Sequence, residues 1–137
     1  MITQEQMPML AIPSMNDTHL EESLLINKLS SVVEKSDLEA IFIVLNELLV
    51  HTRLHYLDEE KLMQESQYPD FEAHKKDHDR HLHEIKSVIA YFEKHQEPRA
   101  VYAYIEGNLT SWVRHHTDTK DRTLALFLKE EKVREED

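Results

Sequence analysis

The chain has 137 residues, one glycine, no cysteine and a formal net charge of −11 at pH 7. This length fits a single domain, and the lack of cysteine excludes disulfides, thiolate metal sites and cysteine nucleophiles. Nucleic acids and anionic membrane surfaces are poor partners for so acidic a chain, because both require a basic surface.

Residues that favour helices dominate the chain, since Leu, Glu, Lys and Ala recur throughout and glycine is nearly absent. We therefore predict an all-α fold. Residues 1–15 contain two prolines and scattered apolar residues, which favours an N-terminal arm lying on the bundle. Asn16 or Asp17 can cap a first helix, whose apolar residues recur at helical spacing until about Glu34.

Two turn signals separate the next two helices. Ser36 followed by Glu39 has the spacing of a capping box, and it predicts a second helix that ends near Ser66. Tyr68-Pro69-Asp70 then breaks the chain. Because proline is well suited to the first turn of a helix, we expect a third helix that includes Pro69 and ends near His95.

The fourth long helix is predicted to start at Glu97-Pro98, and a shorter helical stretch follows from Leu124 to Leu128. Residues 131–137 are a charge run typical of a solvated tail, which leaves residues 16–130 as the bundle domain. The connections between the long helices are short, so neighbouring helices should be antiparallel. The predicted architecture is an antiparallel up-down-up-down four-helix bundle with an N-terminal arm and a short C-terminal helix.

Side chains of metal-ligand type lie on all four predicted helices: His19, His55, Glu59, His74, His78, His116 and Asp121. The pairs His55–Glu59 and His74–His78 are each four residues apart, so the members of each pair share a helix face. A single buried histidine is more often a packed polar residue than a ligand. Ligand sets on four helices indicate a metal site, because burying so many polar groups without a metal would be costly.

The ligand set also limits the metal. Imidazole together with carboxylate suits Fe, Mn, Zn or Cu, and seven ligands exceed what one ion can hold, so two ions are implied. Asp121 follows His116 by five residues, which rotates it about 140° off the His116 face at roughly 100° per residue. The fourth helix should therefore bulge or break between these two residues.

These residues and their neighbours resemble the hemerythrins, including the bacterial single-domain members of that family. The resemblance runs from His19 to about Leu128 and rests on Asp17-Thr18-His19, on the run from His55 to Glu60, on Tyr68-Pro69 before His74 and His78, and on Trp112-Val113 before His116 and Asp121. It implies two iron ions, Fe2+ or Fe3+, with an oxo or hydroxo bridge.

The resemblance also implies how the ligands are divided. One iron would be held by His74, His78 and His116, and the other by His19 and His55, while Glu59 and Asp121 would bridge the two ions. The two-histidine iron keeps an open position, where O2 binds in family members.

Several positions that are usually apolar in the family carry polar residues here: Glu22, Tyr56, His81 and Thr117. We hypothesise that Glu22 reaches the open iron directly or through water; the alternative is a surface glutamate in an acidic helix start. His81 is either an extra ligand, an outer partner of the ligands or a packed histidine. We expect Trp112 to pack beside the site.

Three functions fit this pattern. The first is a protein that binds O2 or another small diatomic molecule for storage, delivery or sensing, and it needs no separate catalytic constellation, so we do not expect an enzyme. The second is redox activity that consumes O2, peroxide or nitric oxide, which the polar residues favour. The third is an iron-binding or metal-buffering bundle without O2 chemistry. The sequence lacks an apolar run of transmembrane length and the regions of a signal peptide, so we expect a cytoplasmic protein.

Overall fold

The fold is a four-helix bundle in the computed structural model, which describes the backbone of residues 13–136 and the side chains of residues 15–130. Three long helices come first: α1 (Pro13–Glu34), α2 (Leu38–Glu65) and α3 (Phe71–His95). The fourth is a continuous run of α-helical and π-helical segments: α4 (Pro98–Tyr104), η2 (Ile105–Leu109), α5 (Thr110–His116), η3 (Thr117–Asp121) and α6 (Arg122–Glu136).

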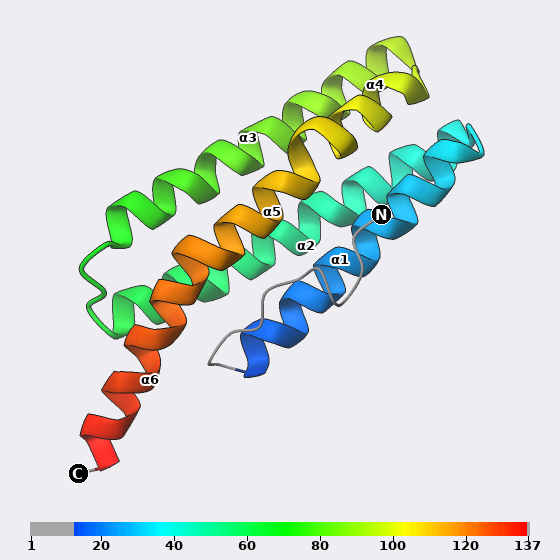
Figure 1. Ribbon diagram of the computed structural model, residues 1–137. Coiled ribbons are helices and arrows are strands. Elements are labelled where there is room, and N and C mark those ends of the chain that lie inside the picture. The colour runs from blue at the N-terminus through cyan, green and yellow to red at the C-terminus, as the bar shows by residue number, and fades with distance from the viewer. Residues whose placement is uncertain (1–12, 137) are drawn as a thin grey trace.

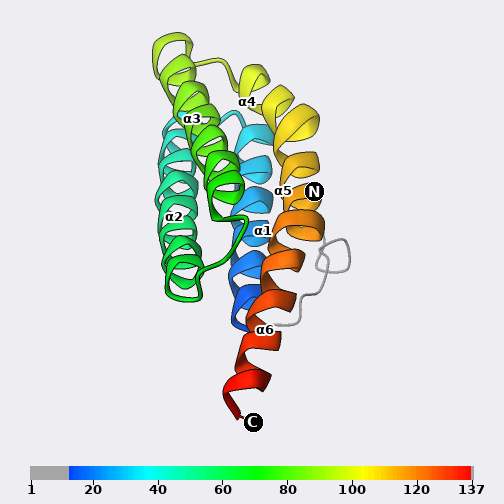
Figure 2. The same cartoon turned by 90° about the vertical axis from the view of Figure 1, so that its left-hand side faces the viewer.

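The helices follow the predicted antiparallel up-down-up-down order (Figures 1 and 2). Helix α1 packs on α2, α2 packs on α3, and α4 packs on both α1 and α3, which closes the bundle. Both views show α6 extending past the ends of the other helices. None of the described helices is long and apolar enough to cross a membrane.

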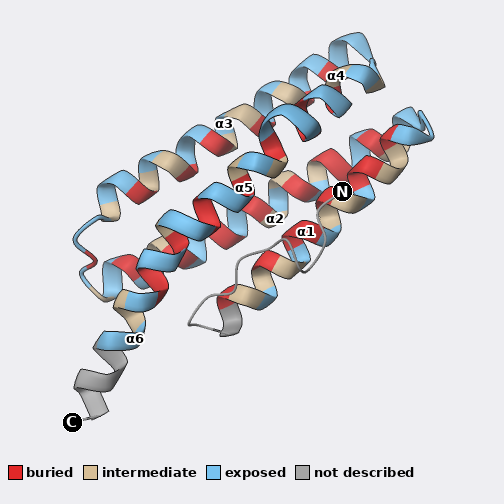
Figure 3. Cartoon of the chain, viewed as in Figure 1, coloured by how far each residue is buried: buried red, intermediate tan, exposed pale blue. Residues whose placement is uncertain are grey.

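Figure 3 shows buried residues along each of the long helices, and their chemistry divides the interior into three layers along the bundle axis. A large apolar cluster, which includes Ile26, Leu45, Ile85 and Leu109, fills the end where α1 meets α2. A smaller apolar cluster around Met63 and Leu124 fills the other end. Between them, each helix of the bundle contributes buried polar residues: His19, Glu22, Ser23, Thr52, His55, Glu59, His74, His78, His81, His116, Thr117 and Asp121.

The helix ends agree with the sequence at Glu34, His95 and Glu97-Pro98, but two predicted starts were wrong. The capping residue of α2 is Asp37, whose side chain accepts a hydrogen bond from the Ala40 amide at 3.1 Å. Ser36 lies one residue earlier with φ of 52°, because it makes the turn out of α1 and is not placed to cap α2.

The third helix begins at Phe71 and does not include Pro69. The Asp70 carbonyl accepts the first helical hydrogen bond, from the His74 amide at 3.0 Å, so Asp70 is the residue at the N-cap. Gln67, with φ of 55°, turns the chain just before this point. Pro69 therefore belongs to the connection between α2 and α3.

The two ends of the chain also differ from the expected boundaries. Helix α1 begins at Pro13, inside the segment expected to be an arm, since proline is tolerated in a first turn. Residues 1–12 of that arm lie outside the described residues. The α6 backbone is helical through Glu136, so it continues into the predicted tail, where lysine and glutamate favour the helix.

Candidate metal centre

All seven side chains predicted as ligands lie in the polar layer and are buried, with no more than 7% of any of them exposed. They come from every helix of the bundle: His19 from α1, His55 and Glu59 from α2, His74 and His78 from α3, His116 from α5 and Asp121 from η3. Residues separated by as many as 102 positions thus meet at one depth.

The seven residues form two overlapping groups whose ligand atoms lie within 4.8 Å of one another. We name the first the three-histidine group: Glu59, His74, His78, His116 and Asp121. The second is the two-histidine group: His19, His55, Glu59 and Asp121. Glu59 and Asp121 belong to both groups, as expected of carboxylates that bridge two ions.

Asp121 presents one carboxylate oxygen to each group. Its Oδ1 lies 3.0 Å from His74 Nε2 and 3.1 Å from His116 Nε2, both in the three-histidine group. Its Oδ2 lies 3.0 Å from His19 Nε2 in the two-histidine group. The carboxylate therefore spans the space between the two sets of imidazoles.

Glu59 has the same arrangement from the opposite helix. Its Oε1 lies 3.1 Å from His74 Nε2 and 3.3 Å from His78 Nε2. Its Oε2 contacts His55 Nε2. Each of the two shared carboxylates thus presents one oxygen to each group.

The π-helical segment η3 brings Asp121 into the centre. A π turn closes its hydrogen bond after five residues, so residues five apart come onto one face. His116 immediately precedes η3 and Asp121 is its last residue. The predicted bulge between these two residues is confirmed, and it compensates the rotation that an α-helix would impose.

Buried polar atoms in the centre provide a test of whether metal ions fit. The Nε2 atoms of His55, His78 and His116 and the oxygens Glu59 Oε2 and Asp121 Oδ1 lack a hydrogen bond of good geometry among the described residues. Buried groups without partners are destabilising. A pair of divalent transition ions would satisfy them, because imidazole and carboxylate are the donors that such ions accept.

The carboxylates and imidazoles shift one another's pKa values. Burial lowers the pKa of His55, but Glu59, Glu22 and Asp121 outweigh it and raise the pKa to about 9. The pKa of His74 is raised to about 9 in the same way, by Asp121 and Glu59 against burial. Burial raises the pKa of both carboxyls, yet the neighbouring histidines hold each of them below its usual range.

Outer carboxylates face the second ring nitrogen of three ligands. Glu60 Oε2 lies 3.0 Å from His78 Nδ1, and Asp77 Oδ2 lies 3.9 Å from His116 Nδ1. The contact of Glu60 is a hydrogen bond, which fixes the tautomer and orientation of the imidazole, whereas Asp77 lies beyond hydrogen-bond distance. Glu60 and Asp77 were missed in the sequence, although each adjoins a ligand in the chain.

Glu22 is the third outer carboxylate. It is 3% exposed, so it is not a surface residue, and its Oε2 lies 3.8 Å from His55 Nδ1. Glu22 is in neither of the two ligand groups of the described chain. Its contact is with the outer side of a ligand ring.

The other polar residues expected near the site are also buried there. Thr117 is 2% exposed and follows His116 in η3. His81 is fully buried, belongs to neither ligand group and lies 2.7 Å from the Tyr56 hydroxyl through its Nδ1. Burial, with a smaller effect of neighbouring histidines, lowers the pKa of His81 to about 3. Trp112 packs on His81 and His116.

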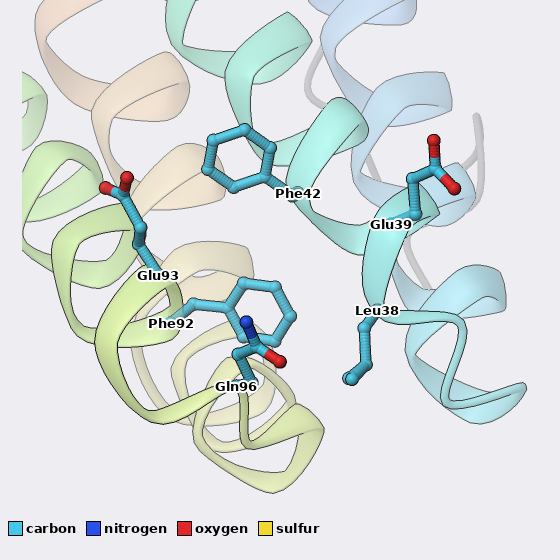
Figure 4. Close-up of a pocket in the computed structure, with 6 residues that line it drawn as sticks. All are labelled: Leu38, Glu39, Phe42, Phe92, Glu93 and Gln96. Atoms are coloured by element: carbon cyan, nitrogen blue, oxygen red, sulfur yellow. The ribbon is translucent and has the colours of Figure 1, made fainter.

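Two hollows differ in their relation to the centre. One hollow, of about 390 Å³, lies between α2 and α3 and is lined by Phe42, Phe92 and their neighbours (Figure 4). None of the seven ligand-type side chains lines it. A smaller hollow of about 140 Å³ between α1 and α2 is lined by Met15, Leu62 and the ligands His55 and Glu59. The second hollow connects the surface to the two-histidine group.

Two comparisons with known proteins fit this geometry. Residues 10–128 match the family model described as Hemerythrin HHE cation binding domain. The chain is also 31% identical over 114 residues to the protein named Bacteriohemerythrin from Aquifex aeolicus (strain VF5), a match that covers 83% of this chain and 87% of that relative. The residues matched by the family model include all seven ligand-type side chains.

Proposed function

The chain belongs to the hemerythrin family, and from this premise we propose that it is a non-haem di-iron protein that binds O2 reversibly for storage, delivery or sensing. The observation that carries the proposal is the pair of ligand groups that share Glu59 and Asp121. One ion would be held by the three-histidine group and the other by the two-histidine group. When bound, the iron pair supplies a free coordination position and the electrons that O2 binding requires.

The unequal number of histidines supports a division of labour between the two ions. A metal position that reacts keeps a coordination site free, whereas a saturated one is structural. The two-histidine group has one imidazole fewer, so it is the side where we expect O2. The small hollow beside His55 and Glu59 gives this side a connection to the surface.

The rest of the chain holds the centre in place and limits water around it. Apolar clusters lie on both sides of the polar layer, so the imidazoles and carboxylates are enclosed by side chains that exclude solvent. The carboxylate of Glu60 orients the His78 ring from outside through a hydrogen bond, and those of Glu22 and Asp77 lie near the outer nitrogens of His55 and His116. Glu60 thus performs positioning, and the described chain needs no separate acid or base for reversible binding.

A second candidate function is redox activity that consumes O2, peroxide or nitric oxide at the same centre. The buried positions of Glu22 and Thr117 favour it, because polar groups beside a metal pair promote proton delivery, which a stable oxygen carrier avoids. The lifetime of the O2-bound form separates the two functions. A long lifetime supports reversible binding, and rapid passage to a stable ferric form supports redox activity.

The test is to load the protein with ferrous iron without oxygen, admit air and follow the visible spectrum. Reversible binding predicts a band that appears with O2 and fades when O2 is removed. The variant His55→Ala should abolish the band, whereas His83→Ala, which changes an exposed histidine on α3, should leave it unchanged. No uptake of iron by the unaltered protein would contradict the proposal.

A further inference from the structure

The buried non-ligand histidine His81 connects two helices at the level of the metal centre. It lies on α3 one turn after His78, and its Nδ1 is 2.7 Å from the hydroxyl of Tyr56 on α2. The phenol and the imidazole nitrogen can each donate or accept, so the tautomer of His81 sets the direction of this hydrogen bond. This hydrogen bond is buried at both ends, which makes it stronger than a surface contact.

Each partner in this hydrogen bond is connected by stacking to a ligand ring, Tyr56 directly and His81 through Trp112. The ring of Tyr56 is parallel to that of His78 at 3.7 Å, with an angle of 4° between the planes. The ring of Trp112 is parallel to that of His116 at 4.5 Å and 11°. His81 also stacks on the tryptophan, at 3.8 Å and 17°.

These contacts form a continuous chain from one ligand to another: His78, Tyr56, His81, Trp112 and His116. We propose that Tyr56, His81 and Trp112 act as one positioning unit that fixes the ring planes of His78 and His116 and so slows loss of metal from the three-histidine group. The inference rests on the proposed di-iron function and adds that the two ions are released at different rates.

The two-histidine group lacks an equivalent support in the described chain. His19 and His55 meet edge to face, with ring centres 5.2 Å apart and planes at 67°. His55 meets Tyr56 at a tilt of 44°. Neither ring is stacked flat on an aromatic side chain of the described residues, so we expect the two-histidine group to release its ion first.

Tyr56 and His81 are a matched pair of polar residues. Both positions are usually apolar in the family that the sequence resembles, and apolar side chains there could pack on the ligand rings but could not form the hydrogen bond between α2 and α3. Replacing only one partner leaves the other polar atom buried without a bond, whereas replacing both removes the two polar atoms together. This difference makes the pair suitable for a double-mutant cycle.

The experiment measures release of iron to a chelator from the fully loaded protein, for the unaltered protein and for Tyr56→Phe, His81→Phe and the double variant. We expect two phases in the unaltered protein. Each single variant should accelerate the slow phase about tenfold or more and leave the fast phase unchanged. The double variant should be less affected than the product of the two single effects.

The matched control is Tyr104→Phe, which removes the hydroxyl of another buried tyrosine that stacks on no ligand ring. Its release phases should equal those of the unaltered protein. Mössbauer spectra of the loaded proteins give a readout that general destabilisation would not produce: Tyr56→Phe should change the signal of one iron and not the other.

An unchanged slow phase in both single variants, with two irons bound, would overturn the inference while leaving the proposed function intact. Failure of the unaltered protein to bind two irons would overturn both. If His81→Phe fails to fold, the slow phase of iron release from Tyr56→Phe tests the inference, because this variant keeps the ring and removes only one oxygen.

Discussion

Histidines in one buried layer take opposite protonation states because their neighbours differ. His55 and His74 face the carboxylates of Glu59 and Asp121, which raise the pKa of each imidazole to about 9. His81 faces Tyr56 and Trp112, and burial lowers its pKa to about 3. All three imidazoles are buried, so the charges around each one decide whether it is protonated at neutral pH.

The low pKa of His81 predicts how acid affects the metal-free protein. The unfolded chain takes up this proton near 6.5 but the folded chain only near 3, so stability is lost as pH falls between these values. His81→Phe should lower the free energy of unfolding at neutral pH. Between neutral pH and pH 4, the variant should lose roughly 3 kcal/mol less of this free energy than the unaltered protein loses. Chemical denaturation at several pH values measures this. The exposed control His83→Ala should keep the original dependence, and an identical dependence in His81→Phe would contradict the assignment.

Removing the charge of one bridging carboxylate should disturb both ions. Glu59→Gln keeps the shape of the side chain but replaces one carboxylate oxygen with an NH2 group. Because one oxygen faces the three-histidine group and the other faces the two-histidine group, one of the groups loses an acceptor. We expect fewer than two irons per protein, measured by metal analysis after desalting. Glu60→Gln is the control, because Glu60 contacts only the outer nitrogen of His78 among the ligands, and it should weaken binding about 10- to 100-fold without lowering stoichiometry at saturating iron.

At the scale of elements, the sequence predicts the parts that follow from spacing. Amphipathic periodicity placed the long helices, and the five-residue step from His116 to Asp121 required a bulge, which is present as η3. The second π segment, η2, was not predicted, since it carries no ligand whose spacing would demand one. The residue that caps α2 was harder to predict, because Ser36 and Asp37 are both good capping residues and only the geometry of the turn selects between them.

Contacts between helices were the other part that spacing did not predict. Glu60 and Asp77 reach ligands on neighbouring helices. The Tyr56–His81 hydrogen bond likewise joins residues 25 positions apart. Periodicity shows which residues face inward, but the rotation of each helix against its neighbours decides which inward residues meet.

Insertion of one alanine after Thr119 tests the interval between His116 and Asp121. The step from His116 to Asp121 then rises to six residues, which turns Asp121 and everything after it by about 100° from its present direction. We expect loss of iron binding with little change in helix content, as measured by metal analysis and circular dichroism. Thr119→Ala, which keeps the residue count, should bind two irons. Full iron binding after the insertion would show that the interval is not required.

At the scale of the whole molecule, the bundle consists of two apolar ends joined by a polar layer. In the metal-free protein this layer is balanced by proton binding, because the imidazoles of His55 and His74 keep their protons to about pH 9 beside ionised carboxylates. Metal ions would replace those protons. Metal binding, proton release and stability of the fold are therefore coupled.

This coupling predicts the pH dependence of metal uptake. Protons compete with metal for His55 and His74, so the apparent affinity should rise with pH until about 9 and level off above it. Loading in weakly buffered solution near neutral pH should release about two protons per protein from these residues, which a pH-stat measures. The metal-free protein should also melt at a lower temperature than the loaded one. An affinity independent of pH between 6 and 9 would contradict the assigned charges.

The π segment has a consequence for how such a chain can change over generations. Asp118 and Thr119 lie between His116 and Asp121 and are exposed, so exchanging one such amino acid for another leaves the ligand directions intact. Adding a residue there turns Asp121 away, whatever the residue is. The number of residues between His116 and Asp121 therefore constrains this segment more than their identity does. A search for relatives should fix the interval from histidine to aspartate and allow different amino acids between them.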